Sequence, residues 1–213
     1  MTAVLICGGT LSAAFLRKVL ERQENVAVYA VDGGLAVAEA AGIVPDYLVG
    51  DFDTADAGLV ARYEKKCVTV RHQPEKDATD TELAIEEAIG NGAEELILLG
   101  ATGSRMDHTM ANIHMLYKVL QMGKTAQIIN ENNRISMHCR AFRKKKEELF
   151  GTYVSFLPFF GEVTGVTLTG VKYPLEGKTL TAGSSLGISN EAVEDVIGVS
   201  FEKGYLLMIE ARD

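Results

Sequence analysis

Residues 26–34 read VAVYAVDGG and residues 47–53 read YLVGDFD, so two short apolar runs each lead into glycine and aspartate. Short runs rich in β-branched residues and bounded in this way are typical of buried strands. Similar runs occur at Val4–Cys7, Val68–Val70, Leu96–Leu99 and Ala126–Ile129, and apolar residues at helical spacing occur at Leu11–Leu20, Leu35–Ala41, Glu82–Ile89 and Thr109–Gln121. This alternation predicts an α/β fold, with a doubly wound, mostly parallel sheet and helices on both faces.

One of these helices has its own start signal. Thr79 and Glu82 have the T-x-x-E spacing of a capping box, in which the hydroxyl at the N-cap accepts a bond from the backbone three residues later. We therefore expect Thr79 to be the N-cap of the helix near residue 80.

The pattern changes after the basic run Arg143–Lys146, which we expect to be a solvated loop or helix end. Glycine becomes denser, and short alternating runs occur at Tyr153–Phe156, Val166–Thr169, Val196–Val199 and Tyr205–Ile209. Such runs predict antiparallel strands joined by glycine-containing turns. We expect an α/β domain over residues 1–140 and a small all-β, sandwich-like domain over residues 141–213.

Composition excludes several classes of protein. The 213 residues carry 21 Lys and Arg against 29 Asp and Glu, a formal net charge of -8, so no overall positive field attracts nucleic acid or anionic lipid. The three cysteines lie far apart, which argues against a zinc site or a disulfide framework and favours a reducing compartment. The opening residues lack a basic segment, and no run approaches the ~20 apolar residues of a membrane span. We expect a cytoplasmic protein.

Carboxylates follow the predicted strands. Because ligands of open parallel sheets bind outside the carboxyl ends of the strands, residues at those ends are candidate site residues. They include Asp32, the pair Asp51 and Asp53, the pair Asp77 and Asp80, and the run Gly103, Ser104, Arg105, Met106, Asp107 and His108. Two carboxylates on one side of the chain repel unless a cation lies between them, and oxygen ligands suit Mg²⁺. Each aspartate alone also suits a helix N-terminus, but the set predicts a metal site.

Glycines and one arginine accompany the acids. Gly8-Gly9 and Gly33-Gly34 each follow a strand and precede a helix, where glycine lets backbone N–H groups approach an anion or simply permits the turn. Neither pair forms a dinucleotide-binding or P-loop motif. Arg105 lies in a Gly-Ser loop, where its guanidinium can either clamp a phosphate or form an ion pair with Asp107.

Together these motifs resemble the thiamine pyrophosphokinase family. The matching segments are Asp32–Gly34, Gly50–Thr54, Lys76–Ala84, Gly100–His108 and Ser184–Asn190, which run in order along nearly the whole chain. The resemblance implies transfer of the pyrophosphoryl group of ATP to the hydroxyl of thiamine, giving thiamine diphosphate and AMP. It also implies a homodimer whose active site lies at the subunit interface.

The resemblance implies a role for each matching residue. Asp51, Asp53, Asp77 and Asp80 would hold Mg²⁺ on the triphosphate, and Ser189 and Asn190 would contact thiamine from the β domain. Gly33, Gly34, Gly103, Ser104, Arg105, Asp107 and His108 would bind the nucleotide. Asp32, Asp77 and Arg105 are the expected catalytic residues, with Arg105 steadying phosphate charge and Asp77 the choice for a base near the thiamine hydroxyl. Some family members stack a Trp on thiamine, but this chain has none, so the sequence does not identify the aromatic partner; a Tyr or Phe such as Tyr205 is a candidate for a cation–π contact.

Two other functions compete with this one. A phosphohydrolase of the haloacid-dehalogenase type uses D-x-D-x-[TV] after a strand, but here the fifth position is Ala55 and the motif follows the third strand. A binding protein that has lost catalysis would have no need of four carboxylates suited to a metal. Metal-dependent turnover separates this last alternative from the enzyme.

Overall fold

The computed structural model describes residues 1–53, 55–73 and 77–213, and the chain divides into two compact units, residues 1–131 and 132–213. Thr54 and Lys76, which belong to the motifs above, lie outside the described residues. The division falls earlier than the expected boundary at residue 140. The reason is that strand β7 (Asn133–His138) pairs antiparallel with β13 (Lys203–Ala211) and so belongs to the second unit.

The first unit is built on a parallel sheet. Its strands are β1 (Thr2–Ile6), β2 (Val26–Val31), β3 (Tyr47–Gly50), β4 (Val68–Arg71), β5 (Glu95–Leu99) and β6 (Thr125–Ile129). They lie in the order β4-β3-β2-β1-β5-β6, and all five pairings are parallel. Their carboxyl ends therefore share one edge of the sheet, as the sequence predicts.

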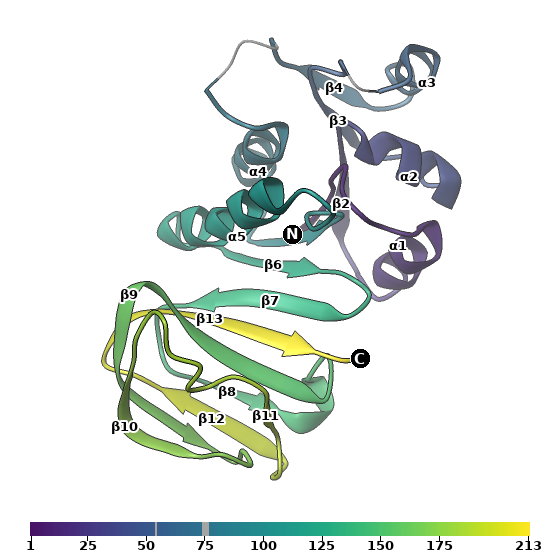
Figure 1. The fold of residues 1–213 in the computed structure, drawn as a ribbon. Coiled ribbons are helices and arrows are strands. Elements are labelled where there is room, and N and C mark those ends of the chain that lie inside the picture. The colour runs from purple at the N-terminus through teal and green to yellow at the C-terminus, as the bar shows by residue number, and fades with distance from the viewer. Residues whose placement is uncertain (54, 74–76) are drawn as a thin grey trace. The chain divides into compact units, whose positions relative to one another are not determined.

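Helices cover this sheet on two sides. They are α1 (Ala13–Leu20), α2 (Gly34–Ala41), α3 (Ala57–Tyr63), α4 (Asp80–Gly90) and α5 (Met106–Gln121). Figure 1 shows α1, α2 and α3 on one side of the sheet, with α4 and α5 on the other. Thr79 is the N-cap of α4, as predicted, and its hydroxyl accepts a bond from Glu82 N. The short helix α3 was not predicted, although Asp56 caps it.

The first unit is stabilised by strands that are buried on both faces. Residues Ala3–Ile6 of β1 have no exposed surface, and Val4 and Ile6 pack against Leu16 of α1 and Ala38 of α2. Burial on both faces explains why β1, β2 and β5 are apolar along nearly their whole length instead of alternating, whereas β4 at the edge of the sheet is exposed or half-buried. The buried sheet provides a rigid base for the loops at its carboxyl edge.

The second unit consists of antiparallel strands and one 3₁₀ turn. Besides β7 and β13, its elements are β8 (Phe142–Lys145), η1 (Lys146–Glu148), β9 (Tyr153–Thr169), β10 (Leu175–Leu180), β11 (Asn190–Glu191) and β12 (Val196–Ser200). The long strand β9 pairs with β13 and β11 through its first half and with β12 and β10 through its second. It joins two runs that the sequence predicts as separate strands. Side chains such as Phe156, Leu168 and Met208 pack in the core of this unit.

The basic run is not the solvated loop or helix end that we expected. Residues 142–145 form β8, which lies last in the strand order of the second unit. Arg143 and Lys145 are exposed, and such charges discourage another chain from pairing with an edge strand. Lys144 instead points inward and bonds the buried Glu210 at 3.0 Å. In the described part of the chain, no helix is long and apolar enough to cross a membrane.

Candidate active site

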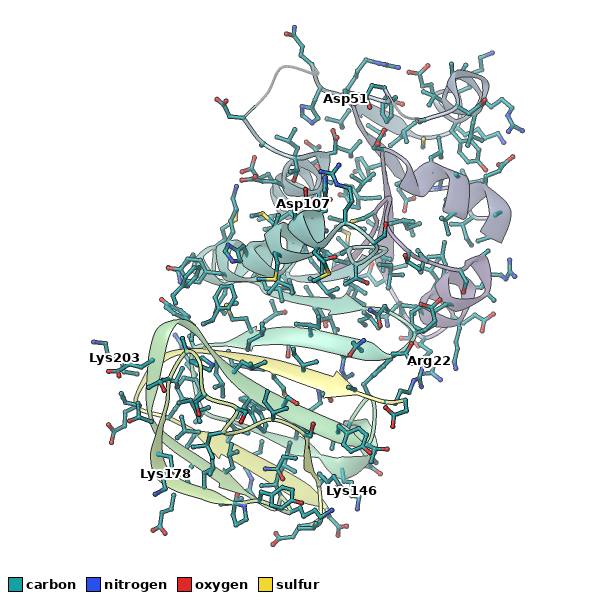
Figure 2. The ribbon with its side chains drawn as sticks, viewed as in Figure 1. Arg22, Asp51, Asp107, Lys146, Lys178 and Lys203 are labelled. Atoms are coloured by element: carbon teal, nitrogen blue, oxygen red, sulfur yellow. The ribbon has the colours of Figure 1, made fainter. Side chains whose placement is uncertain are left out.

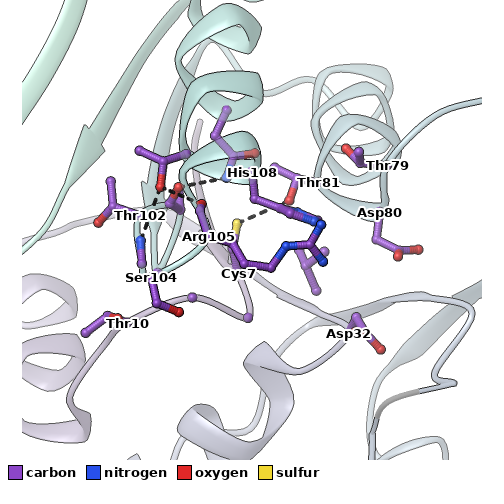
Figure 3. Close-up of a pocket in the computed structure, with 18 residues that line it drawn as sticks. Cys7, Thr10, Asp32, Thr79, Asp80, Thr81, Thr102, Ser104, Arg105 and His108 are labelled. Carbon is purple, nitrogen blue, oxygen red and sulfur yellow. Dashed lines mark hydrogen bonds between the residues drawn. The ribbon is translucent and has the colours of Figure 1, made fainter.

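A cavity of about 650 Å³ lies at the carboxyl edge of the parallel sheet (Figure 3). The chain runs outward from β1 through β2 and β3 to β4 and then returns to β5 on the other side of β1, so the strand order reverses between β1 and β5. Ligands of open α/β sheets bind at such a reversal. The lining comes from the loops that follow β1, β2 and β5 and from the starts of α4 and α5: Cys7, Gly8, Gly9, Thr10, Val31, Asp32, Thr79, Asp80, Thr81, Gly100, Ala101, Thr102, Gly103, Ser104, Arg105, His108, Thr109 and Asn112.

The loops after β1 and β5 touch each other through their backbones. Gly9 N donates to Gly100 O at 2.7 Å, and Thr10 N donates to Thr102 O at 2.8 Å. A Cβ atom on Gly9 would lie 2.4 Å from Gly100 O, which no real contact allows. The Gly8-Gly9 pair therefore permits close approach of two loops, and the N–H of Gly9 is already used.

The second glycine pair has a similar structural role. A Cβ atom on Gly34 would lie 1.8 Å from Ile6 O, so α2 starts against the end of β1 only because this residue is glycine. Gly33 is the N-cap of α2 and has no side chain to bond the helix N–H groups. Neither Gly33 nor Gly34 lines the cavity among its described residues, whereas Gly103 and Ser104 do.

Three carboxylates lie together beside this cavity. One oxygen from each of Asp32, Asp51 and Asp53 lies within 4.8 Å of the others. Asp32 follows β2 with a left-handed backbone (φ 44°), and the other two leave β3, its neighbour, where Figure 2 labels Asp51. The sequence prediction left Asp32 out of the metal group. Asp32 lies 19 residues before Asp51, and residues so far apart in the chain have no spacing that indicates contact. The structure adds Asp32 to the pair.

Electrostatic repulsion in this trio changes the acidity of one member. The Asp51 charge raises the pKa of Asp53, with smaller contributions from partial burial, Asp32 and Asp80. Such repulsion is what a bound cation would relieve, and oxygen ligands at this spacing suit a hard divalent ion. The donor set therefore fits a divalent metal.

The other predicted pair lies at the start of α4. Asp80 is the first residue of that helix, lines the cavity and is near enough to contribute to the raised pKa of Asp53. Asp77 is exposed and precedes the N-cap Thr79. Within the described residues, Asp77 and Asp80 do not belong to the tight trio. Figure 3 shows Asp32 and Asp80 on the same side of the cavity.

Arg105 and His108 project from the start of α5 into the cavity (Figure 3). The Arg105 guanidinium also forms an ion pair with Asp107, with Nη2 2.6 Å from Oδ2, and both side chains are exposed. Hydrogen bonds from Arg105 and from the His108 N–H lower the pKa of Asp107 to about 2. Arg105 is the N-cap of α5 and provides no capping bond from its side chain, so the first-turn N–H groups and the helix dipole favour an anion there.

The loop that holds Arg105 is supported from α5 by residues that sequence reasoning missed. The buried Asn112 donates from Nδ2 to Ala101 O at 2.7 Å. The Thr109 hydroxyl accepts from Gly103 N at 3.3 Å and donates to Arg105 O at 3.2 Å. A detectable signal existed for Asn112, because it is a polar residue at helical spacing from the apolar Leu116 and Val119.

The cavity contains a thiol that is unsuited to nucleophilic attack. Burial raises the pKa of Cys7 to about 11, and the hydroxyl of Thr81 lies 3.7 Å from its sulfur. At neutral pH the group is a thiol and not the reactive thiolate. The cavity offers carboxylates, hydroxyls, backbone donors and a guanidinium, which serve to bind and orient charged groups.

The residues predicted to contact a second substrate lie in the second unit. Asn190 is 2% exposed, and its side chain bonds the backbone of Tyr173 twice, accepting from N at 3.0 Å and donating to O at 2.8 Å. Ser189 is exposed with a left-handed backbone (φ 54°), and its N–H donates to Ser155 Oγ. Asn190 thus anchors Tyr173, whose side chain is 58% exposed.

Comparison with known proteins matches the two parts of the chain to two family models. Residues 18–129 match the family "Thiamin pyrophosphokinase, catalytic domain", and residues 141–206 match "Thiamin pyrophosphokinase, vitamin B1 binding domain". The chain is similar to thiamine pyrophosphokinase of Bacillus subtilis, with 36% identity over 184 residues that cover 86% of each chain. A crystal structure of that enzyme superposes with a TM-score of 0.88 and 32% identity over all of both chains. The Geobacillus thermodenitrificans enzyme superposes with a TM-score of 0.86 and 31% identity, covering 100% of this chain and 98% of the other.

Proposed function

The chain belongs to the thiamine pyrophosphokinase family, and from that premise we propose that the cavity between the ends of β1 and β5 is its transfer site. The reaction moves the pyrophosphoryl group of ATP to thiamine and yields thiamine diphosphate and AMP. The thiamine hydroxyl oxygen forms a bond to the β-phosphorus, and the bridging oxygen leaves with AMP. This location of the transfer site is supported by one observation: the three carboxylates lie beside a cavity at the point where the strand order reverses.

The carboxylates are the proposed holders of a divalent metal, which we take to be Mg²⁺. Asp32, Asp51 and Asp53 supply oxygens at suitable spacing, and Asp80 lies close enough to affect the pKa of Asp53. When bound, Mg²⁺ would neutralise charge on the triphosphate. Asp77, which family resemblance adds to the set, would close the site from the start of α4. Because carboxylates repel a triphosphate, they would direct it only through the cation that they hold.

The α5 end of the cavity is the proposed phosphate-binding side. Arg105 can exchange its exposed pair with Asp107 for a bidentate contact with phosphate, because an exposed ion pair contributes about 1 kcal/mol or less. Backbone donors in the first turn of α5 would add to that contact. The resemblance also assigns Gly33, Gly34, Gly103, Ser104, Asp107 and His108 to the nucleotide. Transfer of this kind depends mainly on positioning and charge, which these groups supply.

The proton of the thiamine hydroxyl needs an acceptor. Asp77 is our proposed base, since its carboxylate is exposed at the start of the helix whose first residue, Asp80, lines the cavity. A carboxylate within one hydrogen bond of the hydroxyl would take the proton as the oxygen attacks.

Thiamine itself is assigned to the second unit, where the resemblance names Ser189 and Asn190. Ser189 is exposed and would contact it, whereas the Asn190 side chain is buried and bonded to Tyr173, so its proposed part is to hold Tyr173 in place. The structure offers a candidate aromatic partner beside them in Tyr173, whose exposed ring is anchored by Asn190. Lys172 Nζ already lies 5.6 Å from the centre of that ring, so the ring accepts a cation on its face. We favour Tyr173 over Tyr205, which is only partly exposed.

Replacing Tyr173 should weaken thiamine binding. Loss of a cation–π contact of about 1–2 kcal/mol predicts a KM for thiamine roughly 5- to 30-fold higher in Tyr173→Ala, with little change in the KM for ATP. Tyr173→Phe should stay close to wild type, and Tyr205→Ala is the comparison that separates the two rings. Equal KM values for thiamine in wild type and Tyr173→Ala would refute this role.

Three further proposals concern the architecture of the second unit, the assembly of the protein and its location in the cell. We propose that the second unit is sandwich-like, since β9 pairs with β13 and β11 and also with β12 and β10, and apolar side chains of β9, β10, β12 and β13 pack in one core. A homodimer with the active site at the subunit interface is the expected assembly, and sedimentation of the purified chain tests its stoichiometry. We also propose a location in the cytoplasm, which the free cysteines support and cell fractionation tests.

The activity is tested by incubating the purified chain with Mg-ATP, with and without thiamine, and separating the products by chromatography. We expect AMP and thiamine diphosphate in equal amounts, only when both thiamine and Mg²⁺ are present. ADP with thiamine monophosphate would show that the transferred group is wrong. Phosphate released without thiamine would indicate a hydrolase instead.

A further inference from the structure

The turn that carries Asp51 and Asp53 has an unfavourable backbone. Phe52, between the two acids, has φ 61°, a left-handed conformation that costs an L-residue with a large side chain about 1 kcal/mol or more. The Phe52 side chain is only 8% exposed and packs in a cluster with residues of β3 and α3, among them Leu48 and Val60. Burying the middle residue directs the flanking carboxylates away from the core, toward Asp32.

A single arginine touches this turn from the neighbouring strand. Arg71 is the last residue of β4, in register with Gly50 at the end of β3. Its guanidinium carbon lies 4.8 Å from the centre of the Phe52 ring, and Nη1 donates to Asp51 O at 3.4 Å. Nη2 forms an ion pair with Glu64 at 2.8 Å, a third contact that favours the same orientation of the guanidinium.

Arg71 contacts the Asp51 backbone and the Phe52 ring of this turn. None of these contacts is a bond to a carboxylate oxygen of Asp32, Asp51 or Asp53. The planar guanidinium covers Phe52 while its N–H group bonds the carbonyl of Asp51, so one group restrains both residues. Such restraint has value because the three carboxylates repel one another and would separate if the turn relaxed. A lysine could not provide the same flat, forked contact.

We propose that Arg71 is a positioning residue, which holds the turn Gly50–Asp53 so that Asp51 and Asp53 face Asp32. The inference rests on the proposed function of these carboxylates as metal ligands. Residues that orient metal ligands typically change metal affinity 10- to 100-fold when they are removed. Arg71 thus acts through the carboxylates and is distinct from Arg105, which acts at the phosphate side of the cavity.

The test measures Mn²⁺ affinity by electron paramagnetic resonance in the absence of nucleotide. We expect Arg71→Ala to bind Mn²⁺ about 10- to 100-fold more weakly than wild type, and Arg71→Lys to recover only part of the loss. Arg62→Ala is the matched control, because Arg62 is a similarly exposed arginine that pairs with Glu39 on α2, away from the turn. Its Mn²⁺ affinity should equal that of wild type.

Kinetics supply the second readout. With Arg71→Ala, the Mg²⁺ concentration required for half-maximal rate should rise, while kcat at saturating Mg²⁺ should return to within about threefold of wild type. A Kd for Mn²⁺ within twofold of wild type would overturn the positioning role, as would a kcat that stays low at saturating metal. If wild type itself binds no Mn²⁺, the proposed metal site fails and this role fails with it, which is a distinguishable result.

Discussion

Asp53→Asn should lower turnover by about a hundred- to a thousandfold and at the same time raise the melting temperature of the metal-free protein. The loss follows if Asp53 is one of the oxygens that hold the metal on the triphosphate, since removing one preorganised charge-stabilising group costs about 10²–10³ in rate. The gain in stability follows from the repulsion by Asp51 and Asp32 that raises the pKa of Asp53. A neutral amide removes that repulsion. Activity and stability should therefore change in opposite directions, as is common at functional sites.

The pH dependence of this stability gain has a definite sign. A carboxyl whose pKa is raised in the folded state destabilises the fold when it is ionised, and the cost disappears once pH falls low enough to protonate it. The difference in melting temperature between Asp53→Asn and wild type should therefore be largest at neutral pH and vanish in acid. Asp195→Asn, which alters an exposed aspartate of the second unit, serves as control. Turnover within tenfold of wild type would contradict the assignment of Asp53.

The second large effect concerns the stability of the second unit in mild acid. Burial lowers the pKa of His138 to about 4, and the neighbouring charge of Lys144 adds to the shift, against a smaller opposing effect of Glu210. The ring stacks on Phe142 with centroids 4.0 Å apart, and Nε2 lies 3.0 Å from Ser136 Oγ. The folded chain therefore keeps this imidazole neutral at a pH where the unfolded chain protonates it.

A histidine with a depressed folded pKa loses its stabilising effect as pH falls below its unfolded value of 6.5 toward 4. The full loss corresponds to about 3 kcal/mol of the free energy of unfolding. Urea unfolding followed by circular dichroism from pH 7 to 4 should show this loss in wild type. It should be much smaller in His138→Asn and unchanged in His114→Asn, where an exposed histidine of α5 is replaced. Equal pH dependence in wild type and His138→Asn would refute the explanation.

A second buried group extends this acid sensitivity to lower pH. The Glu210 side chain has no exposed surface, and Arg134 bonds both of its oxygens, at 2.5 and 2.6 Å. Burial alone would raise the pKa of Glu210, but the bonds and charges of Arg134 and Lys144 outweigh it and leave the pKa lowered. The stability that this group contributes is thus present above its unfolded pKa and is lost as pH falls through the folded value.

Most elements of the first unit could be predicted because their signals are local. The run at 26–31 is apolar and β-branched, and the structure has β2 over those same residues. The cap at Thr79 depends only on residues three positions apart. Helix α3 escaped prediction because its seven residues are too few to show a clear helical period. In the second unit, residues 153–169 form one strand although Phe160 and Gly161 in its middle have positive φ angles. The sequence pattern shows two separate runs there and does not reveal that they are continuous.

The amino-acid sequence by itself determined which residues follow each strand, and in a parallel sheet this is enough to bring aspartates and Arg105 to one edge. It also carries the ordered motifs by which the family was predicted, and the comparisons confirm that family and its activity. Only the tertiary structure decided which acids meet: Asp32 with Asp51 and Asp53. It likewise decided that Asn190 anchors a neighbouring backbone and that Arg71 restrains the acid turn. The physical reason is that strand pairing and burial bring together residues that are far apart in the chain. Their separation in the sequence does not indicate their distance in space.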